Sequence, residues 1–291
     1  MIDLHLHSNC SDGLDSPFEI VDKALNIPNL KAIALTDHDT IDGLEEFLKY
    51  GENEDIILIP GIEISIRHEP ERGLEDVHML GLNIDCNSSQ LLNTLNLQME
   101  GRLKQKEQIC KRLHEEFGYD ISYEEVTSIA GRNAVGRPHI VEIMIKNNPD
   151  LVAGKTKNEL FKMISLGGSA FVDREFELTL EESIELINDA GGIPILAHPG
   201  IYSVSNRSKF VEFCVIAGIK GIEVEYPYAK NRPFVDTDKA EWAQKFLPEY
   251  YRKLAEKFNL IKSGGSDYHG DKKDIKIGEV DVPDEYLKYL L

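Results

Sequence analysis

The sequence predicts an α/β barrel of mainly parallel strands that is interrupted by a small helical insertion domain. Strand and helix signals alternate in the first and last thirds of the 291-residue chain, which is typical of a parallel sheet. Histidines and carboxylates fall at or just after the ends of many of these strands. Only a closed or nearly closed barrel lets so many strand ends converge. The stretch in between has helical signals alone.

The first third of the chain contains four expected strands and two expected helices. Residues 2–7 alternate apolar and polar side chains, as a strand does. Ser16-Pro17-Phe18-Glu19 is a capping box with proline at the first helical position, so a helix should begin there and run to about Ile27. We expect further strands at 32–35, 56–66 and 77–84, and a helix at 41–50. Pro60-Gly61 predicts an irregularity within the third strand.

The middle of the chain carries no convincing strand. Residues 90 to about 146 are rich in Leu, Lys, Glu and Gln and predict helices, with a break at 131–138 and another helix at 155–166. Gly167-Gly168 ends this region. We therefore assign residues 1–87 and 168–291 to a discontinuous barrel domain, and residues 88–167 to a helical insert that contributes to substrate binding.

Alternation resumes in the last third. Thr179-Leu180-Glu181-Glu182 is a second capping box and predicts a helix that ends near Ala190. Strands are expected at 193–197, 221–225 and 260–262, with helices at 208–217 and 237–258 between them. A short strand at 275–277 and a helix from about 283 complete the prediction.

Composition narrows the class of protein and of partner. The chain is 42% hydrophobic and 29% charged, which is ordinary for a globular protein. Its net charge of −19 disfavours long nucleic acid and anionic membranes as partners. The N-terminal residues resemble no secretion signal, and the four cysteines form no CxxC pair. We expect a reduced, cytoplasmic enzyme.

Nine side chains predict a metal centre. Histidine and carboxylate are the preferred ligands of borderline divalent metals, and a single ion takes only about four to six of them. We therefore expect a cluster of two or three metal ions. The nine candidate ligands are His5, His7, Asp12, His38, Glu63, His78, His198, Asp267 and His269.

The spacing of these residues supports the assignment. His5 and His7 are two apart on a strand, so both side chains leave the same face and can reach one ion. Glu63 lies on an otherwise apolar strand, where an unpaired carboxylate would be costly to bury. Its two oxygens could bridge two cations, and the alternative is a structural salt bridge to lysine or arginine.

Loop carboxylates next to these strands have two interpretations each. Asp12 is interpreted as a ligand, although it could form a turn with Gly13. Asp39 is interpreted as a helix cap or as a partner of a ligand, and Asp37 as a residue that orients a ligand histidine.

Tyr226 follows the strand expected at 221–225. It is expected to serve in aromatic packing more than in lining the pocket around the metal ions.

Gly136-Arg137-Pro138-His139 lies in the helical insert. Arginine offers a planar fork that matches phosphate oxygens, so Arg137 and His139 could grip a phosphate as part of a lid. The alternative is a surface loop before a helix that starts at Pro138. Spacing alone favours neither interpretation.

These motifs resemble the PHP (polymerase and histidinol phosphatase) family over most of the chain. Four family motifs occur in order, and Gly61-Ile62-Glu63 and the His78 strand also fit. The motifs are His5-Leu6-His7 with Ser11-Asp12-Gly13, Thr36-Asp37-His38-Asp39, Ala197-His198-Pro199 and Ser266-Asp267-Tyr268-His269. The resemblance implies a distorted (β/α)7 barrel and a trinuclear site of manganese, iron or zinc.

The resemblance also implies three ligand sets. The first metal would be held by His5, His7, Glu63 and Asp267. The second would be held by Glu63, His78 and His198, with Glu63 bridging. The third would be held by Asp12, His38 and His269. The insert is most similar to that of stand-alone nucleotide phosphoesterases, which implies that Arg137 and His139 contact substrate phosphate.

The resemblance implies hydrolysis of a phosphomonoester of a small nucleotide, such as a nucleoside 3′,5′-bisphosphate, or of the 5′ end of short RNA. A hydroxide bridging two metals would be the nucleophile. Three alternatives stay open here. They are a phosphatase for a small molecule such as histidinol phosphate, an amidohydrolase-type deaminase that needs no third metal set, and a structural domain without metals.

Overall fold

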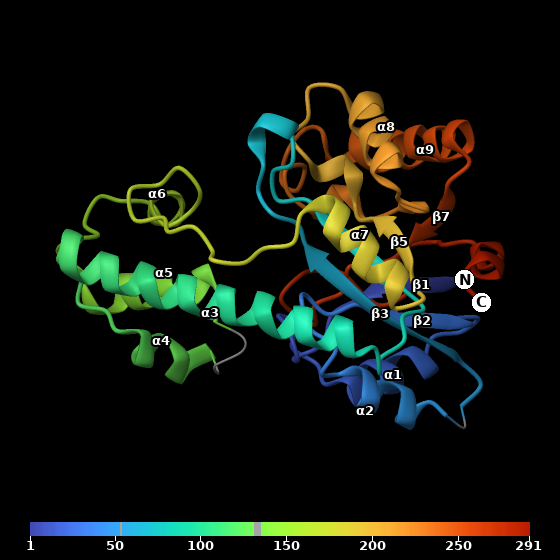
Figure 1. Ribbon diagram of the computed structural model, residues 1–291, viewed down its shortest axis with the longest axis horizontal. Helices are drawn as coiled ribbons and strands as arrows, with labels where there is room; N and C mark the ends of the chain where they lie inside the picture. The colour runs from blue at the N-terminus through green and yellow to red at the C-terminus, as the bar shows by residue number, and fades with distance from the viewer. Residues whose placement is uncertain (53, 131–134) are drawn as a thin grey trace. The chain divides into compact units, whose positions relative to one another are not determined.

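The fold is a nearly closed barrel of seven strands in a computed structural model that describes residues 1–52, 54–130 and 135–291 (Figure 1). The strands follow one another around the sheet in chain order. Beyond β7 the chain returns to β1, where Leu6 bridges Tyr268 and the His7 N–H donates to the Tyr268 carbonyl at 3.0 Å. The strands are β1 (Ile2–Leu6), β2 (Ala32–Leu35), β3 (Ile57–Ser65), β4 (His78–Leu82), β5 (Ile193–Leu196), β6 (Gly221–Glu225) and β7 (Ile261–Gly264).

The barrel is distorted at β4, which is antiparallel to both of its neighbours, while the other strand pairs are parallel. β3 pairs with β2 as far as Pro60 and with β4 from Gly61 onward. The predicted irregularity is therefore the point where β3 changes partner. A Cβ at Gly61 would lie 2.8 Å from Cγ2 of Thr36, so only glycine fits this crossing.

Helices cover the barrel, and both predicted capping boxes are present. Ser16 accepts a hydrogen bond from the Glu19 N–H, and Thr179 accepts one from the Glu182 N–H. The two helices that begin there are α1 and α7. The covering helices are α1 (Pro17–Leu25), α2 (Leu44–Tyr50), α7 (Leu180–Asp189), α8 (Arg207–Ala217) and α9 (Ala240–Phe258).

The barrel agrees with the alternation predicted for β1 and differs from the prediction at 275–277. All five residues of β1 are buried, so its polar face points into the protein. The expected strand at 275–277 is wrong. That segment is irregular, because the Gly278 N–H donates to Oδ2 of Asp3 and the Lys276 N–H to Glu279 instead of to a strand. The terminal helix is a 3₁₀ helix, η4 (Asp284–Tyr289).

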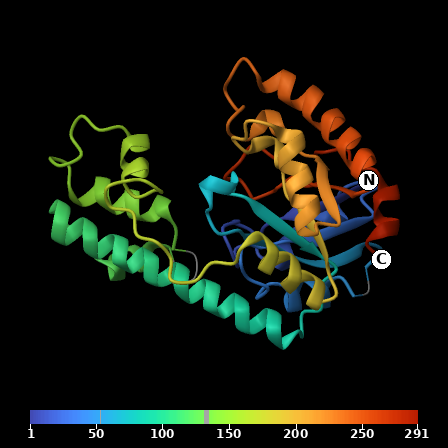
Figure 2. The ribbon, with the colours of Figure 1, turned by 45° about the horizontal axis from the view of Figure 1, so that its top comes forward.

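The two chain ends lie at the same end of the barrel (Figures 1 and 2), and the Ile2 N–H donates to the Val282 carbonyl at 3.2 Å. The strands of the barrel bury a continuous apolar core. Strand residues such as Leu4, Ala34 and Leu80 are completely buried there, and Tyr286 of η4 packs against the same cluster.

The insert has a hydrophobic core of its own. Its helices are α3 (Ser89–Phe117), α4 (Tyr123–Ala130), α5 (Arg137–Asn147) and α6 (Lys157–Met163). Ile109 and Leu113 of α3 pack with Ile140 and Met144 of α5, and all four are fully buried. The chain divides into two compact units, Met1–Leu95 with Leu178–Leu291, and Asn96–Glu177.

Candidate metal centre

Six elements deliver the nine candidate ligands to one end of the barrel. His5 is near the end of β1 and His7 just follows it, whereas His198 and Asp267 follow β5 and β7. His78 begins β4, and because that strand runs backwards, its start lies at the carboxyl end of the parallel strands. Reversal of one strand thus adds a ligand to the same rim.

The structure brings all nine predicted residues together. Their ligand atoms fall into four overlapping groups, and the atoms within each group lie within 4.8 Å of one another. Shared members link the groups into one cluster. The groups are His7, Asp12, His38 and His269; His5, His7 and Asp267; His5, Glu63 and His198; and His38, Glu63 and His78.

Glu63 lies at the centre of the cluster and is 1% exposed. Its Oε1 lies 2.9 Å from Nδ1 of His78 and 2.8 Å from Nε2 of His198. Its Oε2 lies 3.1 to 3.2 Å from ring nitrogens of His5, His7 and His38. The two oxygens therefore face two separate sets of imidazoles, as a bridging carboxylate would. The surrounding histidines outweigh burial and hold the pKa of Glu63 well below its usual value.

Asp267 divides its oxygens in a different way. Oδ1 lies 3.3 Å from Nε2 of His7 and 3.7 Å from Nε2 of His5. Oδ2 accepts hydrogen bonds from the Tyr226 hydroxyl at 2.7 Å and from Nζ of Lys273 at 2.8 Å. One oxygen is thus held in place while the other points at the imidazoles. Tyr226 positions a candidate ligand, which the packing interpretation of this residue missed.

Asp12 joins a third set of imidazoles. Its Oδ1 lies 3.2 Å from Nε2 of His269 and 4.0 Å from Nε2 of His38. The side chain as a whole is 47% exposed, but Oδ1, the oxygen that faces the imidazoles, is buried. Despite partial burial, His38 and His269 lower the pKa of Asp12, which keeps the carboxylate ionised and able to bind a cation.

Backbone strain marks two of the ligand positions. His198 has φ of +25° and Asp267 has φ of +54°, which are values that side-chain-bearing residues rarely adopt. The Tyr202 hydroxyl accepts from the His78 N–H at 3.0 Å and donates to the Ala197 carbonyl at 2.9 Å. These bonds tie β4 to the turn that carries His198. Strain of this kind persists where surrounding contacts over-determine the conformation.

Two carboxylates next to the candidate ligands, Asp37 and Asp39, support the segments that carry those ligands. Asp37 was expected to orient a ligand histidine, but its carboxylate accepts hydrogen bonds from Ser8 and Ser11 at 2.5 to 2.8 Å. It therefore shapes the loop that carries Asp12. Asp39 accepts from the Ser65 N–H and hydroxyl and supports the strand of Glu63. The alternative that it caps a helix is wrong, since the N-cap of α2 is Gly43.

Glu223 is the main residue that sequence reasoning missed. It is fully buried on β6. Oε1 lies 3.0 Å from Nδ1 of His5, and Oε2 accepts from the His198 N–H at 2.6 Å. Holding Nδ1 leaves Nε2 of His5 facing Glu63 and Asp267. The alternation of Ile222, Glu223 and Val224 was the available signal, because it places a carboxylate on a buried strand.

Replacing Glu223 with glutamine is expected to weaken metal binding by about 10- to 100-fold, because partners that orient a ligand histidine contribute about this much. The Kd for Mn²⁺ should be measured by titration of the chelator-stripped protein. The matched control is Glu185→Gln, an exposed change on α7 with the same charge difference. An unchanged Kd in the Glu223 variant would contradict the positioning role.

The residues present fit a group of cations. Among the described residues, Nδ1 of His7 and Nδ1 of His198 are buried and have no hydrogen-bond partner. Burial lowers the pKa of His7, but Asp267 and Glu63 outweigh it and raise the pKa to about 9. The cluster thus favours positive charge at its centre. Uncommitted imidazole nitrogens in a field that attracts cations are what a histidine-carboxylate metal site requires.

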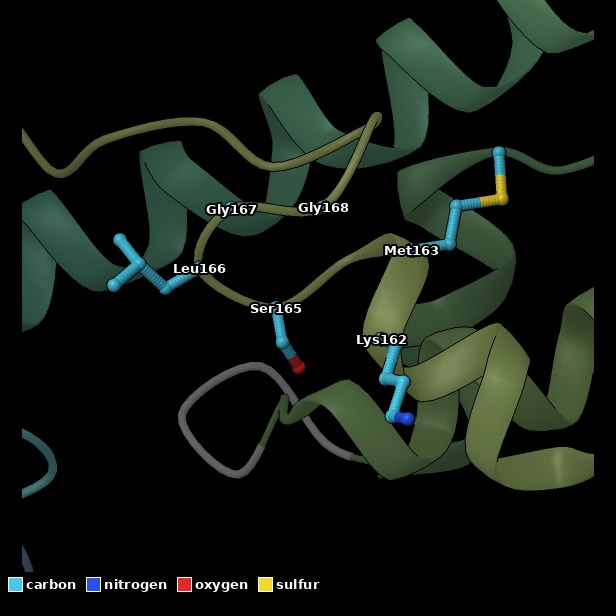
Figure 3. A pocket seen from close by; sticks show the side chains of 6 residues that line it. All are labelled: Lys162, Met163, Ser165, Leu166, Gly167 and Gly168. Carbon is cyan, nitrogen blue, oxygen red and sulfur yellow. The ribbon is translucent and has the colours of Figure 1, made fainter. Parts of the chain in front are cut away.

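Arg137 and His139 lie in the unit formed by Asn96–Glu177. Arg137 is the exposed first residue of α5, and its guanidinium donates to the Ser165 hydroxyl at 3.2 Å. His139 accepts from the Gly136 N–H through Nδ1 at 3.1 Å. Ser165 also lines an open pocket of about 430 Å³ beside the Gly167–Gly168 turn and Lys162 (Figure 3). Arg137 is therefore hydrogen-bonded to one of the residues that line this pocket.

The sequence pattern that defines the PHP domain family matches residues 3–187 of the chain. The chain belongs to the PHP family. A 5′-3′ exoribonuclease of Haemophilus influenzae is 32% identical over 98% of this chain and 96% of its own. A 3′,5′-nucleoside bisphosphate phosphatase of Chromobacterium violaceum is 30% identical over 92% of this chain and 87% of its own. A solved structure described as an amidohydrolase from C. violaceum with bound sulfate shares the fold with a TM-score of 0.76, at 27% identity over 100% of this chain and 97% of that one.

Membership of the PHP family and these relatives make the protein a metal-dependent phosphoester hydrolase. They favour phosphoester hydrolysis over the deaminase and structural-domain alternatives. The histidine and carboxylate groups at the barrel rim are able to bind the metal. In the part of the chain that the structure describes, no helix is long and apolar enough to span a membrane.

Proposed function

We propose that this PHP enzyme hydrolyses the phosphomonoester of a small nucleotide, a nucleoside 3′,5′-bisphosphate, or acts at the 5′ end of short RNA. The observation that carries the proposal is Glu63, whose two oxygens face different sets of imidazoles from five histidines. Such a carboxylate suits two adjacent cations, and paired cations suit a phosphoryl group. The names of the relatives support nucleotides as substrates.

Two or three divalent ions would be held in three ligand sets. His5, His7, Glu63 and Asp267 form the first set, Glu63, His78 and His198 the second, and Asp12, His38 and His269 the third. The close groups of ligand atoms include His5, His7 and Asp267 of the first set and all of the third set. The second set is supported by Oε1 of Glu63, which lies 2.9 Å from His78 and 2.8 Å from His198. Manganese, iron and zinc all accept imidazole and carboxylate.

Bound ions of this kind acidify water and neutralise charge on phosphoryl oxygens. The protein supplies orientation. Lys273 and Tyr226 hold Oδ2 of Asp267, and Glu223 holds His5 and the backbone of His198. The three candidate ligand carboxylates carry −3 against +4 to +6 from two or three divalent ions. The loaded pocket would be positive and would attract a phosphate dianion within an acidic protein.

Arg137 and His139 are proposed to contact substrate phosphate. Arg137→Ala should lower kcat/KM by roughly 10- to 100-fold, mainly through KM, because a charge-assisted bidentate contact is lost. Arg137→Lys should restore little, since an ammonium cannot form the fork. Steady-state kinetics on the preferred nucleotide provides the measurement.

The matched control for Arg137 is Lys111→Ala, which removes a positive charge from an exposed position on α3 in the same unit. It should behave like the unmodified enzyme. If Arg137→Ala and Lys111→Ala have the same small effect, the contact with substrate phosphate is disproved. His139→Ala should affect the same parameters as Arg137→Ala if both residues touch one phosphate.

Phosphate release from a panel of substrates tests the proposed function. The panel contains adenosine 3′,5′-bisphosphate, short 5′-phosphorylated RNA and histidinol phosphate, each with the protein reconstituted with Mn²⁺. We expect turnover of the nucleotide or of the RNA and little turnover of histidinol phosphate. A preference for histidinol phosphate would replace the proposed substrate class with an amino-alcohol phosphate.

A further inference from the structure

Two loops at the barrel rim supply Asp12 and His269 of the third proposed ligand set. The first loop, residues 8–15, follows β1, and the second loop, residues 265–274, follows β7. Oδ1 of Asp12 lies 3.2 Å from Nε2 of His269, so a shift of one loop against the other would separate these two ligands. Both loops belong to the same compact unit of the chain.

The second loop is fixed to the first strand of the barrel. The Asp267 N–H donates to the His5 carbonyl at 2.9 Å, and the Tyr268 carbonyl accepts from the His7 N–H at 3.0 Å. Tyr268 is also buried. It is therefore a fixed point in the chain between two candidate ligands, Asp267 and His269.

The Tyr268 hydroxyl contacts the first loop. It donates to Oδ2 of Asp15 at 2.5 Å. Nζ of Lys23 on α1 donates to the same carboxylate oxygen at 2.5 Å and to the Tyr268 hydroxyl at 3.0 Å. The Asp15 side chain is 15% exposed, and a carboxylate in such a setting is stabilised by charged and hydroxyl donors. We call Lys23, Asp15 and Tyr268 the latch.

The latch anchors the part of the first loop that follows Asp12. The part before Asp12 is held by hydrogen bonds to Asp37. The Asn9 N–H donates to the Asp15 carbonyl at 2.8 Å, which closes the loop on itself. The position of Asp12 relative to His269 therefore depends on where Asp15 is held.

The backbones of the two loops also approach each other closely. Gly270 has φ of +75°, and a Cβ at this position would lie 2.7 Å from Cβ of Leu14, so glycine is required there. Nζ of Lys272 donates to the Asp12 carbonyl. These contacts and the latch join the loops on the two sides of the Asp12 and His269 pair without using either ligand side chain.

We propose that the latch positions Asp12 against His269 and thereby sets the affinity of the third proposed metal ion separately from that of the other two. The inference rests on the proposed function, which supplies the three ligand sets. The ligands of the first and second sets are held without the latch. Asp267 is held by Tyr226 and Lys273, and the others lie on or directly beside strands of the barrel. The latch residues act on the ion through Asp12 and His269, as positioning residues.

Titration of the chelator-stripped protein with Mn²⁺ tests the proposal, with free Mn²⁺ followed by its electron paramagnetic resonance signal. The unmodified protein should bind an ion in each of the three sets. Tyr268→Phe removes only the hydroxyl and keeps the buried ring, so the variant should fold. It should weaken the third ion by about 10-fold, and Asp15→Ala should weaken it by about 10- to 100-fold, while the other ions keep their Kd.

The matched controls are Tyr289→Phe and Asp22→Ala, which make the same chemical changes at exposed positions. Both should bind Mn²⁺ like the unmodified protein. The double variant, Asp15→Ala with Tyr268→Phe, should be no weaker than Asp15→Ala alone, because both changes break the same contact.

Three results would overturn the latch. They are an unchanged affinity for the third ion in both single variants, an equal loss of affinity for every ion, and additive losses in the double variant. If the unmodified protein never fills the third set, the latch and that ligand set are both disproved, while phosphate release from the panel of substrates still decides the proposed function.

Discussion

Asp267→Asn is expected to abolish turnover, with a loss of at least about 10³-fold in kcat, while the protein stays folded. The substitution keeps the shape of the side chain but removes the charge and one of the two equivalent oxygens. Oδ1 faces His5 and His7, and Oδ2 is held by Tyr226 and Lys273, so an amide cannot satisfy both sides. Release of inorganic phosphate provides the measurement, and circular dichroism confirms the fold.

The control for Asp267→Asn is Asp22→Asn, the same chemical change at an exposed position of α1. That variant should retain full activity. Full activity in the Asp267 variant would falsify its assignment as a ligand and would reduce the first proposed set to His5, His7 and Glu63.

Glu63→Gln should have an equally large effect on kcat and a wider effect on metal content. The carboxylate is the shared neighbour of five imidazoles and the proposed bridge between two ions. An amide in its place presents an N–H to one of the two sets. We expect the loss of both bridged ions and of at least about 10³-fold in kcat.

Metal analysis after reconstitution and gel filtration measures this second effect, with Glu185→Gln as the matched control. Retention of the normal metal content in the Glu63 variant would show that the carboxylate does not bridge. A variant that keeps its metals and loses only activity would instead make Glu63 a proton-transfer group.

Short sequence motifs predicted those parts of the fold that are stabilised by contacts between residues close in sequence. The capping boxes at Ser16 and Thr179 satisfy orphan N–H groups within four residues, so sequence alone located both helix starts. The prediction of a short strand at 275–277 was wrong because the structure of this segment depends on a residue distant in sequence. Its apolar alternation was real, but a strand needs a partner, and Asp3 takes the N–H of Gly278 from 275 residues away.

The residues of the candidate site also fall into those that the local sequence predicts and those that only the assembled sheet explains. His5 and His7 were predictable because a strand sends alternate side chains to one face, and the other ligands because they sit near strand ends. Glu223 and Lys273 were missed, since their roles depend on which strands become neighbours. The reversed direction of β4, which brings His78 to the rim, is likewise a property of the assembled sheet.

Anomalous scattering from crystals of the protein reconstituted with Mn²⁺ tests the central claim most directly, because it counts and locates the ions. The account predicts two strong peaks on either side of the Glu63 carboxylate, and a third near Asp12, His38 and His269 when that set is filled. A single peak remote from Glu63, or no peak within reach of the nine side chains, would contradict it.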